Sequence, residues 1–186
     1  DVTDPHRAVC PARHAGALDS PIRRWLQSPQ RLLAPHVREG MTALDFGCGP
    51  GFFTPDLARL VGPSGRVIAA DLQAEMLERL RAKLRGTPLE SRVTLHQCPP
   101  DRIGLTRQVD FALAFYVLHE LPDAAAFFAE VRTLLTAEGR LLVVEPPLHV
   151  TKAAFEQTLR AARDAGLLVA ARPRIPFNKV ALLRVG

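Results

Sequence analysis

Residues 43–54 read Ala43-Leu44-Asp45-Phe46-Gly47-Cys48-Gly49-Pro50-Gly51-Phe52-Phe53-Thr54, and this stretch decides how the rest of the chain is interpreted. It begins with the apolar pattern of a buried strand, continues with three glycines within five positions, and leads into a helical pattern. Glycine adopts a positive φ easily and leaves no Cβ between the backbone and a ligand. This order predicts a nucleotide-type cofactor site at the carboxyl end of a parallel strand, with N–H groups at the helix start facing the ligand.

A second strand-like stretch, Val67-Ile68-Ala69-Ala70-Asp71, ends in a carboxylate. An acid in this place can accept hydrogen bonds from both hydroxyls of a ribose. The dinucleotide fingerprint requires a glycine at the sixth position of the loop, where this chain has Phe52. NAD is therefore the poorer fit among nucleotide-type cofactors.

The glycine spacing, the acid Asp45 before it and the acid Asp71 after the second strand resemble the class I S-adenosylmethionine (SAM)-dependent methyltransferases, over about residues 40–186. The resemblance implies that residues 47–51 wrap the methionine part of SAM, that Asp45 positions its amino group and that Asp71 holds its ribose. It also places the backbone near Cys98 and Pro99 beside the adenine, although this family often has an acid there and the nearest one here is Asp101. The implied cofactor-binding residues are Asp45, Gly47, Cys48, Gly49, Gly51, Phe52, Asp71, Leu72, Cys98, Pro99 and Phe115.

Alternating strand and helix patterns predict a single doubly wound, Rossmann-like α/β domain over residues 39–186. After the first strand and the glycine loop, further strands are expected over 67–71, 93–97, 109–116, 141–145, 167–171 and 180–185. Helices are expected from residue 54 and over 73–85, 124–135 and 151–165. The resemblance implies a seven-stranded, mostly parallel sheet of order 3-2-1-4-5-7-6, with the last strand antiparallel and helices on both faces.

Residues 1–38 precede the first strand and contain helix-start signals at Ser20-Pro21 and Ser28-Pro29. Short helices are expected after each signal, the second over residues 30–36. In the resembling family two short helices roof the cofactor, so residues 1–38 are expected to form a lid with Trp25 contacting the substrate. The alternative, in which Trp25 simply packs on the sheet, stays open.

The loop after the fourth strand carries three candidate catalytic residues, Tyr116, His119 and Glu120. A hydroxyl or an acidic carbon must lose a proton when it is methylated, and histidine titrates near neutrality. His119 could instead cap or brace the next helix. Glu145, at the end of the fifth strand, and His149, in the loop that follows, are candidates for substrate contact.

Composition narrows the function classes. The chain has 186 residues, 47% hydrophobic and 23% charged, which suits one globular domain. No apolar stretch approaches the ~20 residues that span a bilayer, and the amino terminus lacks the order of a signal peptide. The three cysteines are few and scattered, so neither a disulfide framework nor a metal site is expected. We expect a reduced, cytoplasmic protein that is a monomer or a homodimer.

The net charge of +5 permits contact with nucleic acid but does not require it. The stretch 110–123 resembles small-molecule methylases, including the ubiquinone/menaquinone-biosynthesis type. It lacks the Asn-Pro-Pro-Tyr signature of many methylases that act on amino groups of bases. The expected function is therefore methyl transfer from SAM to a small molecule by in-line displacement. The alternatives are an RNA or protein methyltransferase, or a non-catalytic SAM-binding subunit.

Overall fold

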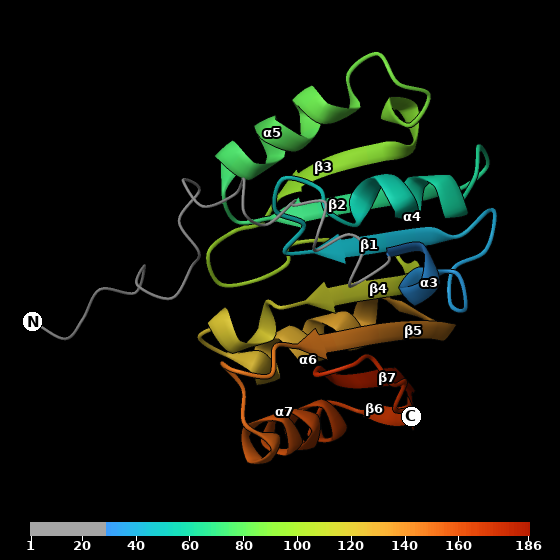
Figure 1. Cartoon of the computed structure of the whole chain (residues 1–186). Helices are drawn as coiled ribbons and strands as arrows, with labels where there is room; N and C mark the ends of the chain where they lie inside the picture. Colours follow the sequence, from blue (N-terminus) through green and yellow to red (C-terminus); the bar gives the residue numbers. More distant parts are fainter. Residues whose placement is uncertain (1–28) are drawn as a thin grey trace, which may run out of the picture.

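The computed structural model describes residues 29–186, and it contains the expected seven-stranded sheet (Figure 1). The strands are β1 (Thr42–Phe46), β2 (Arg66–Asp71), β3 (Val93–Gln97), β4 (Val109–Phe115), β5 (Leu135–Glu145), β6 (Leu167–Ala171) and β7 (Lys179–Val185). They lie in the order β3-β2-β1-β4-β5-β7-β6. All neighbours are parallel except β7, which is antiparallel to both β5 and β6. The predicted fold class, strand order and direction of the last strand are confirmed.

Helices cover both faces of the sheet. One face carries α3 (Pro29–Leu33), α4 (Thr54–Leu60) and α5 (Ala74–Leu84), and the other carries α6 (Ala124–Leu134) and α7 (Lys152–Asp164). Successive strand residues point to opposite faces, so Ala43 packs with α3 and α4 while Leu44 packs with α6 and α7. Burial on both faces explains why the central strands are almost continuously apolar.

The helices form where the sequence patterns predict them. In α5 the buried residues Met76, Leu77, Leu80 and Leu84 share one face, as expected for an amphipathic helix. The side chain of Thr151 accepts a hydrogen bond from the N–H of Ala154 at 3.1 Å and so caps α7. Such a cap contributes about 1 kcal/mol to helix stability. No helix within residues 29–186 is long and apolar enough to cross a membrane.

The structure changes some of the predicted boundaries. The helix expected over 30–36 is shorter, because α3 ends at Leu33, ahead of Pro35, which lacks an N–H and disfavours helical backbone before it. The fifth strand begins at Leu135 rather than at residue 141, and a bulge interrupts its pairing with β4 between Val109 and Phe111. The turn-like Gly139 lies inside this bulge, which explains why the early part of β5 does not look like a strand in the sequence.

Residues 29–38 are the part of the predicted lid that the structure describes, and they pack on the sheet. Leu33 and Val37 are buried in the same cluster as α4 and the central strands. The helix expected after Ser20-Pro21, together with Trp25, lies outside the described residues. The lid role of residues 1–38 therefore stays a prediction.

One edge of the sheet collects the loops that matter for function. The arrowheads of β1, β4 and β5 point to the left in Figure 1, and the loops after these strands gather at that side. Because β7 is antiparallel to β5, its first residue, Lys179, lies opposite Glu145 at the same edge. The strand order reverses between β1 and β4, which is where open α/β sheets bind their ligands.

Candidate functional site

The glycine loop after β1 is fixed by hydrogen bonds to β2. The N–H groups of Gly47 and Cys48 both donate to the carbonyl of Ala70, at 2.8 and 3.1 Å. The N–H of Gly49 donates to Oδ2 of Asp71 at 2.9 Å. The loop and the acid at the end of β2, which the sequence analysis assigned to one site, are thus joined by a direct bond.

The three glycines of the loop are required for different structural reasons. All have a positive φ, of 69° at Gly47, 53° at Gly49 and 83° at Gly51. A Cβ at Gly47 would lie 2.6 Å from Cγ2 of Val117, and one at Gly51 would lie 2.3 Å from Cδ1 of Leu80. A Cβ at Gly49 would have no atom within 4 Å. The first and third glycines therefore allow close packing within the protein, and only Gly49 borders open space.

Asp71 is held by two backbone hydrogen bonds and keeps acceptor capacity for a further partner. Its side chain is only 9% exposed, and burial raises the pKa of its carboxyl group above the usual value. Oδ2 accepts from Gly49, and Oδ1 accepts from the N–H of Gln73 at 2.9 Å. A carboxylate has about four acceptor positions, so each oxygen retains capacity for a further bond.

Asp45 is a second buried carboxylate beside the loop. It is 3% exposed, and its Oδ2 accepts the hydroxyl proton of Thr54 at 2.6 Å. The pKa of Asp45 is raised to about 7, because burial and, to a smaller extent, the nearby charge of Asp71 raise it more than the bond from Thr54 lowers it. An acid whose ionisation is opposed by burial and by a neighbouring acid favours a ligand that brings positive charge. SAM carries a sulfonium and an ammonium group, so these residues fit it.

The loop after β3 offers less to an adenine than expected. The N–H of Cys98 donates to the carbonyl of Asp71 at 2.9 Å, and Pro99 has no N–H. Burial raises the pKa of the Cys98 thiol to about 12, so the thiol stays protonated. A contact between adenine and this segment must use other groups, and the adenine assignment stays a prediction.

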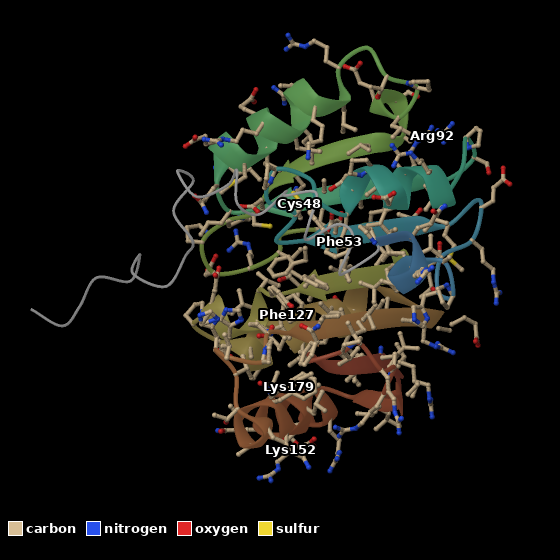
Figure 2. The ribbon with its side chains drawn as sticks, in the orientation of Figure 1. Cys48, Phe53, Arg92, Phe127, Lys152 and Lys179 are labelled. Atoms are coloured by element: carbon tan, nitrogen blue, oxygen red, sulfur yellow. The ribbon has the colours of Figure 1, made fainter. Side chains whose placement is uncertain are left out.

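The remaining predicted cofactor residues lie around the same edge. Phe52 and Phe115 are buried and both contact Phe53, with ring centroids 4.8 and 4.5 Å apart. Figure 2 shows Cys48 and Phe53 near the carboxyl end of β1. Leu72 directly follows Asp71, and its carbonyl accepts from Nε2 of Gln97 at 3.4 Å.

His119 and Glu145 are brought together at the end of β5. Glu145 is 2% exposed, and its Oε2 lies 2.5 Å from Nδ1 of His119. Its Oε1 accepts from the N–H of Leu118 at 3.0 Å. The ring of His149 lies parallel to that of His119, with a centroid separation of 6.0 Å. The predicted substrate contact of Glu145 stays untested; its carboxylate lies beneath His119.

Tyr116 and Glu120 flank this cluster. Tyr116 follows β4 with a φ of 58°, unusual for a residue with a side chain, and its hydroxyl donates to Oδ1 of Asn178. Glu120 is half-buried at the end of η3 (Leu118–Glu120). Trp25 lies outside the described residues, so the structure does not place it relative to the other candidates.

A groove of about 720 Å³ adjoins the cluster between α7 and the segment that leads into β7. It contains four basic side chains and one acidic side chain, Glu156, which is paired with Arg172 at 2.6 Å. Lys179 bonds the carbonyl of Pro147 at 3.4 Å, which ties this segment to the loop after β5. Figure 2 shows Lys152 and Lys179 on this part of the molecule. The lining residues are Lys152, Phe155, Glu156, Arg172, Pro173, Arg174, Ile175, Pro176, Phe177, Asn178, Lys179 and Val180.

Sequence reasoning missed Asn178, Thr54 and the groove. Asn178 meets Tyr116 across 62 positions of the chain, and no local pattern marks such a pair. Thr54 was expected only to start a helix, whereas its hydroxyl serves Asp45. Within residues 29–186 no group of three or more His, Cys, Asp or Glu side chains could hold a metal ion.

Comparison with known families agrees with this geometry. Residues 37–172 match the model of a family described as a methyltransferase domain. The chain therefore belongs to this family. Its fold is that of the class I SAM-dependent methyltransferases, with the glycine loop at the carboxyl end of the parallel strands. The resemblance first inferred from the glycine loop and the two acids is confirmed, and SAM is the cofactor of this class.

Curated relatives match part of their own length. The chain is 34% identical over 110 residues to a demethylmenaquinone methyltransferase of Lactobacillus johnsonii, which is 59% of this chain and 45% of that protein. It is 39% identical over 112 residues to an uncharacterized 37.1 kDa transposon protein of Streptomyces fradiae, covering 59% of this chain and 31% of the relative. The chain thus spans less than half the length of these relatives.

A solved structure matches almost throughout. A SAM-dependent methyltransferase from Aquifex aeolicus is 27% identical, with a TM-score of 0.84, and the match covers 95% of this chain and 98% of that one. A TehB-like SAM-dependent methyltransferase from Corynebacterium glutamicum has a TM-score of 0.72 at 18% identity, covering 95% of this chain and all of that one, which shows the shared fold.

Proposed function

We propose that this chain transfers a methyl group from SAM to a small-molecule acceptor by in-line displacement. The observation that carries the proposal is the pair of buried carboxylates, Asp45 and Asp71, beside the open space over Gly49. When bound, SAM supplies the activated methyl group. The chain's own residues then hold the two reactants in line, which alone can contribute several kcal/mol.

Each cofactor residue has a proposed task. Asp71 accepts the ribose hydroxyls with the capacity that its bonds to Gly49 and Gln73 leave. Asp45 holds the ammonium group, with Thr54 keeping its carboxylate in place. Gly49 admits the ligand to the backbone because it has no side chain.

The acceptor side is proposed to lie between the loops after β4 and β5 and the basic groove. Strands in a sheet are about 4.8 Å apart, so β7 lies roughly 10 Å from β4, within reach of the far end of a small molecule. The groove's excess of basic side chains favours an acceptor with an anionic group. The relative from Lactobacillus johnsonii is named a demethylmenaquinone methyltransferase, and a relative from Pasteurella multocida, 34% identical over 110 residues, is named a ubiquinone/menaquinone biosynthesis C-methyltransferase. These names support a ring-shaped small molecule as acceptor.

Labelled SAM tests the acceptor class. The protein is incubated with methyl-labelled SAM and a cell extract divided into small-molecule, protein and RNA fractions. We expect label in the small-molecule fraction. Label in RNA or protein alone would contradict the proposal. SAM binding by titration calorimetry without label in any fraction would identify a non-catalytic SAM-binding subunit instead.

A further inference from the structure

Glu145 presents a buried carboxylate that needs an explanation. It is 2% exposed at the end of β5, and an ionised carboxylate is costly to bury unless its oxygens accept hydrogen bonds. Both oxygens do so, Oε1 from the N–H of Leu118 and Oε2 from Nδ1 of His119. These two donors are consecutive residues of the loop after β4. The single carboxylate of Glu145 therefore holds both a backbone N–H, that of Leu118, and a side chain, that of His119.

The bond to Glu145 determines which ring nitrogen of His119 carries the proton. An ionised carboxylate only accepts hydrogen bonds, so Nδ1 must be the donor. In the neutral ring the other nitrogen, Nε2, then has a lone pair and no proton. The His119 side chain is 25% exposed, in contrast to the buried Glu145. The ring is thus held from the protein side and partly open to its surroundings.

We propose that Glu145 is a positioning residue that keeps Nε2 of His119 as a proton acceptor, so the molecule that is methylated carries an acidic hydrogen, as a hydroxyl or an activated C–H group does. This inference rests on the proposed methyl transfer. If Glu145 served only to brace the loop after β4, its bond to the N–H of Leu118 would be enough. Such a role does not require a histidine at the next position. An amine acceptor that is already deprotonated would have no use for the base before transfer.

The proton and electron balance of the step is complete. The acceptor's O–H or C–H bond breaks, its proton goes to Nε2 of His119, and its electron pair forms the bond to the methyl carbon. The electron pair of the broken sulfur–carbon bond stays on sulfur. His119 afterwards releases the proton to water, so the net products are the methylated acceptor, S-adenosylhomocysteine and one proton. No oxidant or further reactant is needed.

The charges around the ring favour this role. The hydrogen bond that His119 makes to Glu145 raises the pKa of His119, burial lowers it, and the charges of Glu145 and Glu120 raise it. Within the part of the chain that the structure describes, the ring of His149 also faces His119 and lies parallel to it. A raised pKa makes the neutral ring a stronger base. It also means that transfer should increase as the pH rises through the pKa of His119.

NMR of the protein itself tests the arrangement without any acceptor. The protein is labelled with ¹⁵N-histidine, and the His119 signals are assigned by their loss in His119→Gln. We expect the neutral ring of wild-type His119 to carry its proton on Nδ1, and its pKa to fall in Glu145→Gln. The control Glu138→Gln changes an exposed acid of the same strand and should leave both properties unchanged.

A neutral His119 with its proton on Nε2 would overturn the inference, and so would a pKa that is equal in wild type and Glu145→Gln. If Glu145→Gln does not fold, the wild-type tautomer still decides. In the transfer assay with ¹³C-methyl SAM, His119→Gln should lower turnover roughly 10²–10⁴-fold while SAM binding persists. The ¹³C shift should place the methyl on oxygen or carbon; methyl on nitrogen alone would also overturn the inference.

The two proposals can fail separately. If SAM binds but no fraction of the extract is methylated, the proposed function fails while the NMR result still tests how Glu145 holds His119. If methyl transfer occurs and the wild-type ring has the other tautomer, the proposed function survives and this inference does not. Where transfer occurs, its acid limb should move to lower pH in Glu145→Gln, since that variant lowers the pKa of His119.

Discussion

Asp71 connects the loop and the proposed ribose site through a single side chain. Asp71→Ala is expected to weaken SAM binding by about 1.5–3 kcal/mol, roughly 10–160-fold in Kd, because a charge-assisted acceptor is lost. Titration calorimetry measures the change. Asp71→Asn keeps an oxygen for the Gly49 N–H and so separates loss of the ribose from loosening of the loop. Glu138→Ala removes an exposed acid of β5, away from the glycine loop, and should have no effect. Unchanged affinity in Asp71→Ala would remove the ribose assignment.

We expect Asp45 to lower the stability of the folded protein at neutral and higher pH, although it contributes to SAM binding. Its pKa is raised from 3.8 to about 7 in the folded protein, so its contribution to stability is complete below pH ~4 and is lost as the pH rises through about 7. Asp45→Asn is therefore expected to melt like wild type near pH 4 and higher above pH 7. Each kcal/mol gained corresponds to roughly 2–4 °C.

The same Asp45→Asn variant should bind SAM more weakly, since it lacks the charge for the ammonium group. Thermal melts across pH and calorimetry at pH 8 provide the two measurements. A variant that is less stable at high pH, or one that binds SAM as wild type does, would contradict this account of Asp45. Thr54→Val, which removes the hydroxyl donor to Asp45, should lower stability and serves as the comparison.

At the level of single residues, the sequence predicted which residues meet at the glycine loop, but it did not predict the contacts that each side chain makes. Asp45, Asp71 and the glycines follow a spacing that directly reflects the loop geometry, so their meeting at one loop could be predicted from the chain alone. The substrate contact expected of Glu145 stays a prediction, because sequence position shows that it ends a strand but not how deeply its side chain is buried. Its partner His119 lies 26 positions away, and such a bond depends on the packing of two loops.

The glycine loop can be tested as an element with a matched control elsewhere. Gly49 and Gly86 both have a positive φ, of 53° and 70°, and a Cβ at either would meet nothing within 4 Å. Gly49→Val and Gly86→Val should therefore incur similar backbone strain, of order 1–3 kcal/mol. Only Gly49→Val should abolish SAM binding, because Gly86 lies past the end of α5. Circular dichroism and calorimetry of both variants decide this, and retained SAM binding in Gly49→Val would show that the loop is only a turn.

Most elements were predictable because their patterns are local. The strand β3 and the buried face of α5 follow from alternation and helical periodicity within a few residues. The start of β5 was missed because its first residues include the exposed Glu138 and a glycine, and only pairing with β4 makes them a strand. Likewise, the end of β4 at Phe115 depends on the unusual backbone of Tyr116.

On the scale of the whole molecule, residues 1–38 are proposed to form a lid over the acceptor. Deleting residues 1–28 leaves α3 and the buried Leu33 and Val37 in place, so the melting temperature should change little. If the deleted segment closes over the acceptor, labelling of the small-molecule fraction should fall far more than SAM affinity. A large fall in melting temperature would show that the segment belongs to the core. Trp25→Ala in the full chain provides a milder version of the same test.

The antiparallel β7 has a consequence for how this protein can diversify. Because β7 returns to the edge where β5 ends, the groove and the loop after β5 come from one continuous piece of chain, residues 146–180, whereas both cofactor acids precede residue 72. A single recombination event in the gene could thus exchange the groove and the loop after β5, which form one part of the proposed acceptor surface, as a unit. A chimera that carries residues 146–180 of a relative should inherit that relative's choice of acceptor and keep the SAM affinity of its host.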